Sequence, residues 1–277
     1  MDITAFIRNA LIEDVGNGDH TSLACIAPQA IGKARLLVKQ PGVIAGIELA
    51  TLICKEVDWD LEVEELLYDG AVVQVGDVGL ILQGRKQSIL KAERLLLNCM
   101  QRMSGIATLT NQYVQAVAGT SARILDTRKT TPGFRFFEKW AVRLGGGHNH
   151  RYGLYDMMMI KDNHHDYCGG IVNAIHLAQE YLAQTKLNLK IEIEVRNLKE
   201  LDLVLQTGQV DRIMFDNFDV PTTHKAVELV NRKFETESSG GIDLNTVSGY
   251  AETGVDFISV GALTHSYTSM DISLKAI

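Results

Sequence analysis

The chain has 277 residues, of which 46% are hydrophobic and 22% are charged, and its formal net charge is -7. This length fits one large or two modest domains. The negative charge argues against general affinity for nucleic acid, because the phosphates would repel the protein. No apolar run approaches the roughly 20 residues of a membrane span, and the first residues resemble a helix rather than a signal peptide. The four cysteines lack metal or redox spacing, so we expect reduced thiols in a cytoplasmic protein.

The first third of the chain mixes predicted helices and strands. Apolar residues share one helical face over 2–14, among them Ile3, Phe6 and Ile7. The other predicted elements are a strand at 34–46, a helix at 47–57, strands within 61–67 and 71–84, and a helix at 90–105 that ends at a glycine. We therefore expect a small α+β domain over residues 1–107.

From residue 108 onward, predicted strands alternate with predicted helices. The strands fall at 122–126, 157–162, 190–195, 211–216, 234–241 and 255–261. The helices fall at 134–145, 169–184, 198–207, from Pro221 onward, and at 243–252. This alternation predicts parallel βα units in a barrel or an open parallel sheet. We expect a barrel of six or seven strands, fewer than the eight of the standard form.

Polar residues and glycines end these predicted strands. They are Asp126, Lys161, Glu194, Asp216, Ser239, Gly240, Gly241 and Gly261. In α/β barrels the carboxyl ends of the strands meet at one mouth, where active sites lie. We therefore expect residues that are far apart in the sequence to share one pocket.

Two acidic residues, Glu194 and Asp216, end neighbouring predicted strands. Carboxylates at this place can hold sugar hydroxyls or a hard divalent cation such as Mg2+, which prefers oxygen ligands. The alternative is a pair of solvated charges at the starts of loops. The alternation within 190–195 favours a functional role, because it places Glu192 and Glu194 on one face of a strand.

Glycine turns follow the last two predicted strands, at 239–241 and at Gly261. In barrels such turns can expose backbone N–H groups to a phosphate, helped by the amino end of the following helix. Each turn alone is a weak signal, because glycine turns occur throughout βα folds. Two in succession make phosphate binding as good an explanation as a plain turn.

The stretch 126–164 gathers cationic side chains in an acidic protein. Its arginines and lysines are Arg128, Lys129, Arg135, Lys139, Arg143, Arg151 and Lys161. Such a set would repel itself unless a multiply charged anion joined it, and arginine pairs bidentately with carboxylate or phosphate. Arg128 and Lys129 follow a predicted strand and Lys161 ends one, so these three are placed for ligand contact.

Other residues of this stretch have more than one explanation. Arg143 belongs to the surface of the predicted helix 134–145, and Arg135 and Lys139 on the same helix are either structural or part of the site. His150 lies beside Arg151, which favours contact with an anion, although a lone buried histidine is more often a hydrogen-bonded core residue. The histidines of 145–151 lack zinc-ligand spacing.

Several motifs resemble those of the quinolinate phosphoribosyltransferase family. The central ones are TRKTTPGFR (127–135), GGGHNHR (145–151) and KDNH (161–164). Further matches are EDVGNGDHTS (13–22), ERLLLNCMQRMSGIAT (93–108), EIEV (192–195), FDN (215–217), SSGGI (238–242) and VGALTHS (260–266). The resemblance covers nearly the whole chain, and the central motif is long and ordered.

This resemblance implies a fold and an assembly. The fold is an N-terminal α/β sandwich domain over 1–107, followed over 108–267 by a seven-stranded α/β barrel, an incomplete form of the TIM barrel. The tail at about 268–277 would pack on the first domain. The assembly is a homodimer with the active site near the subunit interface.

The resemblance also implies roles for individual residues. Quinolinate would be held by Arg128, His150, Arg151, Lys161 and, from the partner subunit, Arg94. Phosphoribosyl pyrophosphate would be contacted by Lys129, Glu194 and Asp216, with Mg2+ near the two acids. Its 5-phosphate would bind Ser239, Gly240, Gly241 and Gly261. The implied reaction is transfer of phosphoribosyl to quinolinate with loss of CO2.

Three other functions stay open from the sequence. A paralogue with a different acceptor is disfavoured by the intact KDNH and HNHR motifs. A nicotinate phosphoribosyltransferase binds one carboxylate and would need fewer cations than this chain offers. A non-catalytic phosphate-binding barrel would be expected to lack Glu194 or Asp216, and both are present.

Overall fold

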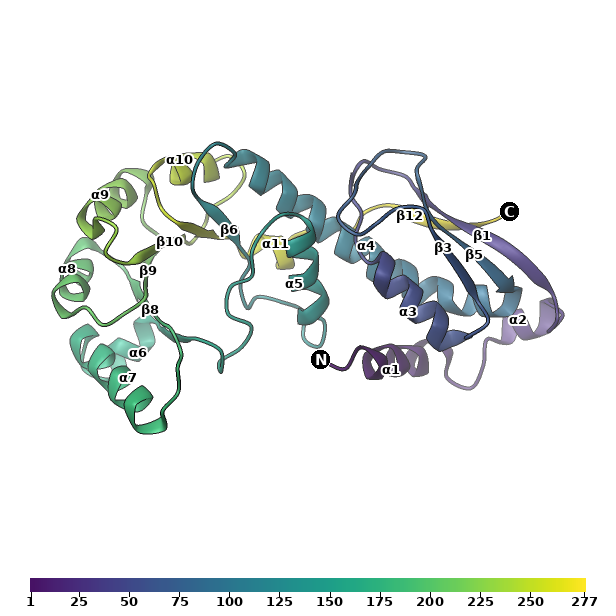
Figure 1. Ribbon diagram of the computed structural model, residues 1–277, viewed down its shortest axis with the longest axis horizontal. Coiled ribbons are helices and arrows are strands. Elements are labelled where there is room, and N and C mark those ends of the chain that lie inside the picture. Colours follow the sequence, from purple (N-terminus) through teal and green to yellow (C-terminus); the bar gives the residue numbers. More distant parts are fainter. The chain divides into compact units, whose positions relative to one another are not determined.

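The computed structural model describes every residue of the chain, 1–277, and divides into two compact units (Figure 1). The first unit comprises Met1–Asn111, Pro132–Gly146 and Tyr267–Ile277, and the second comprises Gln112–Thr131 and Gly147–Ser266. The segment Pro132–Gly146, which the sequence assigned to the barrel domain, thus lies in the first unit. None of the helices is long and apolar enough to cross a membrane.

An antiparallel sheet of four strands, in the order β12-β1-β5-β3, organises the first unit. The strands are β12 (Ile272–Ala276), β1 (Ile31–Val38), β5 (Val78–Arg85) and β3 (Glu62–Glu65); β2 (Gly42–Val43) and β4 (Val72–Val73) form a separate pair. The helices are α1 (Ile3–Val15), α2 (His20–Cys25), α3 (Ile47–Val57), α5 (Arg135–Leu144) and most of α4 (Lys86–Ala116). Strand β12 pairs with β1, so the last residues of the chain form an edge of this sheet.

Helix α4 does not end at Gly105, where the sequence predicted its end, but continues to Ala116. The glycine at position 105 is explained by a close approach of another segment of the chain. A Cβ at this position would collide with the backbone of Thr268 and Ser269. The glycine therefore lets the segment that leads to β12 pass close to the helix.

Helix α5 joins the first unit through aromatic packing. Phe137 is fully buried, and its ring centroid lies 4.6 Å from that of Phe6 on α1. Lys139 is also buried, whereas Arg143 is exposed, as the sequence predicted for a surface position. Neither Arg143 nor Lys139 lines the pocket described below.

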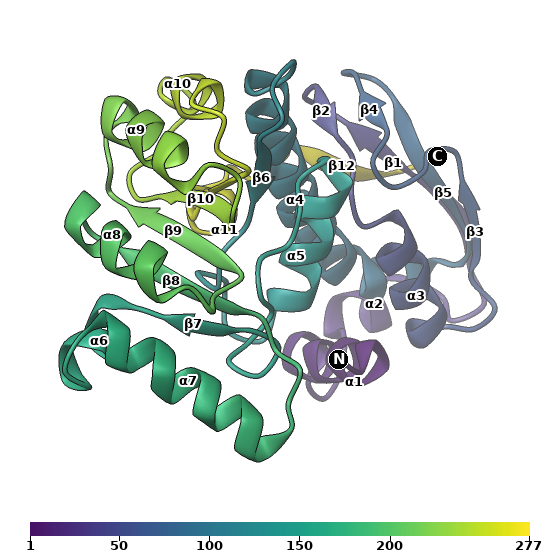
Figure 2. The same cartoon turned by 60° about the vertical axis from the view of Figure 1, so that its left-hand side comes forward.

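Six parallel strands in the order β6-β11-β10-β9-β8-β7 form the sheet of the second unit. They are β6 (Arg123–Leu125), β7 (Met158–Ile160), β8 (Ile191–Val195), β9 (Arg212–Asp216), β10 (Glu235–Ser239) and β11 (Phe257–Ser259). The helices are α6 (Asp162–Tyr167), α7 (Ile171–Thr185), α8 (Leu198–Thr207), α9 (Val220–Val230), α10 (Val247–Glu252) and α11 (Ala262–His265). Figure 2 shows α7, α8 and α9 lying along one side of the strands.

The predicted seven-stranded barrel is present as six strands and one bridge. His148 pairs in parallel with Leu125, and its N–H donates to the carbonyl oxygen of Ile124 at 2.8 Å. This single residue occupies the seventh strand position, next to β6. The architecture is the α/β, barrel-like one that the alternating pattern predicted.

Charged residues lie on the same face of neighbouring strands in this sheet. Glu194 is paired in register with Met214, and Met214 with Glu237. Paired residues of adjacent strands point to the same face, and so do residues two apart. Glu192, Glu194, Asp216 and Glu237 therefore share one face, and β8, which carries two of them, is buried along its whole length.

Candidate active site

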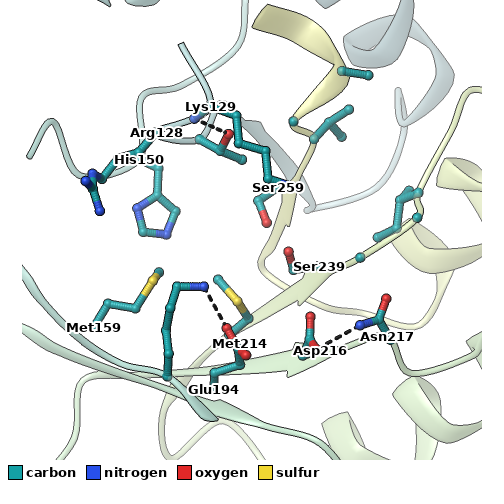
Figure 3. Close-up of a pocket in the computed structure, with 18 of the residues that line it drawn as sticks. Arg128, Lys129, His150, Met159, Glu194, Met214, Asp216, Asn217, Ser239 and Ser259 are labelled. Carbon is teal, nitrogen blue, oxygen red and sulfur yellow. Dashed lines mark hydrogen bonds and ion pairs between the residues drawn. The ribbon is translucent and has the colours of Figure 1, made fainter. Parts of the chain in front are cut away.

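A cavity of about 650 Å3 lies at the carboxyl ends of the strands of the second unit (Figure 3). Its volume is typical of small-molecule sites. Of the predicted site residues, those that line it are Arg128, Lys129, His150, Arg151, Lys161, Glu194, Asp216, Ser239, Gly240, Gly241 and Gly261. Arg94 does not: it is exposed on α4, and every lining residue belongs to the second unit.

The two predicted acids are each held by a neighbour. Lys161 Nζ lies 2.9 Å from Glu194 Oε2 and forms an ion pair with it. Asn217 Nδ2 donates to Asp216 Oδ2 at 2.8 Å. Lys161 itself caps helix α6, where its N–H donates to Nδ1 of His164 at 2.9 Å. His164, the histidine of the KDNH motif, is therefore explained by this capping contact, and it does not line the pocket.

Lys129 lies in a tightly fixed backbone segment. Thr264 Oγ1 donates to the carbonyl oxygen of Lys129 at 2.8 Å, and the N–H of Lys129 donates to Thr127 Oγ1 at 3.0 Å. A Cβ on Gly261 would lie 3.0 Å both from Lys129 Cδ and from His265 Nε2. The glycine at 261 therefore leaves room for the side chains of Lys129 and His265 at this wall of the cavity.

Arg151 and Arg128 are close enough to affect each other. Burial and the charge of Arg128 lower the pKa of Arg151, the burial effect being the larger. The guanidinium of Arg151 is held through a hydrogen bond from Nη1 to the carbonyl oxygen of Met157 at 3.3 Å. Two neighbouring guanidinium groups repel unless an anion lies between them, so this pair is suited to a carboxylate or phosphate.

The turn after β10 has the conformation that only glycine adopts readily. Gly240 has φ +98° and Gly241 has φ +63°. A Cβ on Gly240 would collide with the side-chain oxygen of Asn217, whose own φ is +55°. The turn and the residue after Asp216 therefore fit together, and the backbone of the turn is accessible to a ligand in the cavity.

His150 reaches the cavity, but its two ring nitrogens are engaged elsewhere. The N–H of Arg151 donates to Nδ1 at 2.6 Å. Nε2 lies 3.1 Å from Glu192 Oε2 and 3.4 Å from Glu237 Oε2. The sequence favoured a direct contact between His150 and an anion, whereas these contacts direct its polar atoms into the protein interior.

Glu192 and Glu237 form a buried acidic pair below His150. Neither has any exposed surface. Burial first and the charge of Glu237 second raise the pKa of Glu192 to about 7. Burial also acts to raise the pKa of Glu237, but His150 and Arg212 outweigh it and lower that pKa. Arg212 Nη1 lies 3.0 Å from Glu237 Oε2, and the guanidinium carbon is 3.9 Å from the centroid of the Phe257 ring.

Other residues line the cavity without having been assigned to the site from the sequence. They are Thr127, Met159, Met214, Asn217, Ile242, Ser259, Val260, Ala262 and His265. Met159, Met214 and Ser259 occupy strand positions whose side chains face the cavity, as strand alternation could have indicated (Figure 3). Asn217 and His265 lie within the FDN and VGALTHS motifs. These motifs could therefore have indicated both residues as part of the site.

The donor set of the cavity suits Mg2+. Glu194 and Asp216 offer carboxylate oxygens from adjacent strands, and Mg2+ is commonly held by one or two carboxylates together with water and substrate phosphates. The cluster of three close ligating side chains, His150, Glu192 and Glu237, is a different place. There the guanidinium of Arg212 already supplies positive charge.

Comparison with protein families gives a match over nearly the whole chain. The model of the quinolinate phosphoribosyl transferase C-terminal domain matches residues 106–275, and that of the N-terminal domain matches residues 19–104. These two segments together exceed half of the chain.

Individual proteins are similar over the same length. The chloroplastic, carboxylating nicotinate-nucleotide pyrophosphorylase of Arabidopsis thaliana is 47% identical over 289 residues, covering 99% of this chain and 82% of the relative. The corresponding protein of Mycobacterium leprae is 42% identical over 97% of this chain and 95% of the relative. The crystal structure of NadC from Streptococcus pyogenes has a TM-score of 0.94 at 36% identity, covering 99% of this chain and 97% of that one. The chain belongs to the quinolinate phosphoribosyltransferase family.

Proposed function

We propose that this protein transfers the phosphoribosyl group of phosphoribosyl pyrophosphate to quinolinate, releasing pyrophosphate and CO2 and forming nicotinate mononucleotide for NAD biosynthesis. One observation carries the proposal. A single cavity gathers Arg128, Lys129, Arg151 and Lys161 beside two carboxylates and two glycine turns. The names of the relatives support the same reaction.

Quinolinate carries two carboxylates on adjacent carbons of a pyridine ring. The paired guanidinium groups of Arg128 and Arg151 suit one carboxylate, and Lys161 suits the other. Lys161 pairs with Glu194, so contact with quinolinate would exchange one carboxylate partner for another. Met159 and Met214 supply apolar wall for the ring.

Phosphoribosyl pyrophosphate fits the other half of the cavity. The turns at Gly240–Gly241 and at Gly261 are suited to its 5-phosphate, since they line the cavity and glycine has no side chain of its own to cover the backbone N–H. Glu194 and Asp216 would hold the ribose hydroxyls or Mg2+. When bound, Mg2+ would neutralise charge on the pyrophosphate.

The residues of the cavity act mainly by position and charge. The bond from C1 of the ribose to pyrophosphate breaks, and Lys129 stabilises the negative charge that the leaving group gains. The pyridine nitrogen forms the new bond to C1 and becomes cationic. The bond between C2 and its carboxylate then breaks to release CO2, and C2 takes up a proton. Holding the two anionic substrates together supplies much of the rate, because proximity can contribute roughly 7–11 kcal/mol.

We further propose a homodimer in which Arg94 of one subunit completes the quinolinate site of the other. Arg94 is exposed, and it belongs to a unit that contributes no residue to the cavity lining. Mg2+ dependence and a cytoplasmic location stay predictions.

A direct assay tests the proposed function. Purified protein is incubated with Mg2+, phosphoribosyl pyrophosphate and quinolinate labelled with 14C in the 2-carboxylate. We expect labelled CO2 and pyrophosphate in equal amounts, and neither when one substrate or Mg2+ is omitted. Nicotinate replaces quinolinate in a parallel reaction. Pyrophosphate release with nicotinate alone, or no release from the folded protein with either acceptor, would show that the proposed function is wrong.

A further inference from the structure

Beneath the cavity, the second unit contains charged side chains that the proposed reaction leaves without a role. Glu192 and Glu237 are fully buried, and Arg212 is nearly so, with 12% of its side chain exposed. Burying carboxylates is unfavourable unless they are paired and hydrogen-bonded. A hydrophobic interior would be the simpler way to fill a barrel, so this charged cluster calls for an explanation.

The cluster is connected to the cavity through His150. Both carboxylates face Nε2 of the His150 ring, at 3.1 Å from Glu192 and 3.4 Å from Glu237. The opposite ring nitrogen, Nδ1, accepts the hydrogen bond from the backbone N–H of Arg151. On the other side, the N–H of His150 donates to Oδ1 of buried Asp126 at 2.9 Å. The backbone that carries Arg151 is therefore attached at two points to buried acids.

A bound cation is not needed to account for the cluster. Arg212 Nη1 pairs with the same oxygen of Glu237 that faces His150. Arg212 also stacks on Phe257 and pairs with Glu235, so its position is fixed independently of the histidine. His150 and Arg212 together lower the pKa of Glu237, and Glu237 and Glu192 together hold the ring.

We propose that Glu192 and Glu237 are positioning residues for recognition of the dicarboxylate substrate, acting through the ring of His150 on the backbone of Arg151. The inference rests on the proposed function, which assigns Arg151 to quinolinate. Its physical reason is the repulsion between Arg151 and Arg128, which favours separation of the two guanidinium groups when no anion is bound. Groups held in advance lose less freedom when a ligand binds, and this increases affinity.

Charge-removing variants of equal shape test the proposal. Glu192→Gln and Glu237→Gln are assayed for kcat and for the KM of each substrate, and for binding of phthalate, an unreactive benzene dicarboxylate. Thermal unfolding is followed in parallel. Glu235→Gln is the matched control, because Glu235 lies on the same strand and pairs with the same Arg212, but it is more exposed and is not among the close partners of His150.

We expect both variants to raise the KM for quinolinate and the Kd for phthalate by roughly tenfold or more, since the close contact between a charged carboxylate and Nε2 of His150 is lost. The KM for phosphoribosyl pyrophosphate should change by less than about twofold, and Glu235→Gln should match the wild type. Arg212→Lys offers a second route if a glutamine variant does not fold. This substitution removes the guanidinium that pairs with Glu237 but leaves both carboxylates in place, and it should raise the KM for quinolinate.

A double-mutant cycle shows whether Glu192 acts through His150. If it does, Glu192→Gln should add nothing to the loss of quinolinate binding already caused by His150→Ala. The inference would be overturned if the losses caused by Glu192→Gln and His150→Ala multiplied in the double variant. It would also be overturned if the glutamine variants raised the KM values of both substrates equally, or left the KM for quinolinate unchanged. Failure of the proposed function is distinguishable, because then the wild type itself would neither bind phthalate nor use quinolinate.

Discussion

Gly240 shows how a residue without a side chain can shape the site. It lies in the turn after β10, beside Asn217, and Asn217 in turn donates to the carboxylate of Asp216. The orientation of that carboxylate therefore depends on the space that Gly240 leaves. Gly241, the next residue, also has a positive φ, but nothing lies within 4 Å of the place where its Cβ would be.

This difference predicts unequal effects of two alanine substitutions. Both Gly240→Ala and Gly241→Ala strain the backbone at positive φ, by about 1–2 kcal/mol. Only Gly240→Ala also displaces Asn217, so it should raise the KM for phosphoribosyl pyrophosphate roughly tenfold more than Gly241→Ala does. Steady-state kinetics with quinolinate held at saturation measures this difference. Equal KM values for the two variants would show that Asn217 does not orient Asp216.

The sequence predicted which residues line the cavity where the pattern of one strand was sufficient. The alternation of 190–195 and the ends of the strands led to Lys161, Glu194 and Asp216, which all line the cavity. Glu237 was missed although it lies in the predicted strand 234–241. Its importance comes from the register of β10 with β9, which brings it to Arg212 and His150, and a single sequence does not contain that register.

At the scale of elements, the glycine at position 105 of helix α4 is explained by a tertiary contact and not by helix propensity. Glycine in a helix interior is about 1 kcal/mol less favourable than alanine, so propensity alone predicts that Gly105→Ala stabilises the protein. The collision with the backbone of Thr268 and Ser269 predicts the reverse, a loss of roughly 1–3 kcal/mol, because backbone cannot rotate away. Urea unfolding followed by circular dichroism measures the sign.

Gly249 in helix α10 is the control for this prediction. A Cβ there would meet Val220 Cγ2 at 3.4 Å, an ordinary contact, and its φ is not positive. Gly249→Ala should therefore be neutral or stabilising by up to about 1 kcal/mol. A stabilising Gly105→Ala would mean that the glycine is not required by the segment leading to β12.

The pair Asp58–Arg85 joins the end of α3 to the end of β5. Arg85 Nη2 and Nε donate to the two carboxylate oxygens at 2.7 and 2.8 Å, and these bonds hold the pKa of Asp58 well below its usual range. A depressed carboxyl pKa stabilises the fold above the unfolded-state pKa of about 3.9, and this stabilisation is lost as pH falls below it.

Asp58→Asn should therefore lower the free energy of unfolding at pH 7 by about 1 kcal/mol, a modest effect because half of the Arg85 side chain is exposed. The difference from the wild type should shrink as pH falls from 4 to about 2. Denaturant titrations at pH 7 and at pH 3 measure it. A difference that is the same at both pH values would mean that the carboxylate charge contributes nothing.

Element assignment from the sequence was accurate for strands and helices of regular pattern and failed where distant packing decides. Helix α5 was predicted at 134–145 and lies at Arg135–Leu144, yet it belongs to the first unit and not to the barrel. The reason is the contact of Phe137 with Phe6, which are far apart in the chain. Periodicity identifies an apolar face but not the element that it packs against.

At the scale of the whole molecule, the charge distribution is uneven. The protein carries a formal net charge of -7, yet its cavity is lined by four arginines and lysines and two acids. The net negative charge disfavours general binding of polyanions, while the cavity remains suited to small anions. The net charge and the cationic residues can be read from the sequence, but only the fold brings Arg128 and Lys161 together in one cavity.

The proposed dimer makes a quantitative prediction at this scale. Arg94→Ala and Lys161→Ala should each nearly abolish activity alone. In a mixed dimer, one site would combine the intact Lys161 of its own subunit with the intact Arg94 of the partner subunit, and the other site would lack both. Random exchange of equal amounts should therefore restore about a quarter of the wild-type activity per subunit.

Activity is measured after mixing under mild denaturation and refolding, with subunit exchange followed by native mass spectrometry. If mixed dimers form without recovery, Arg94 serves its own subunit or none, because complementation between two inactive chains requires that each site draw residues from both.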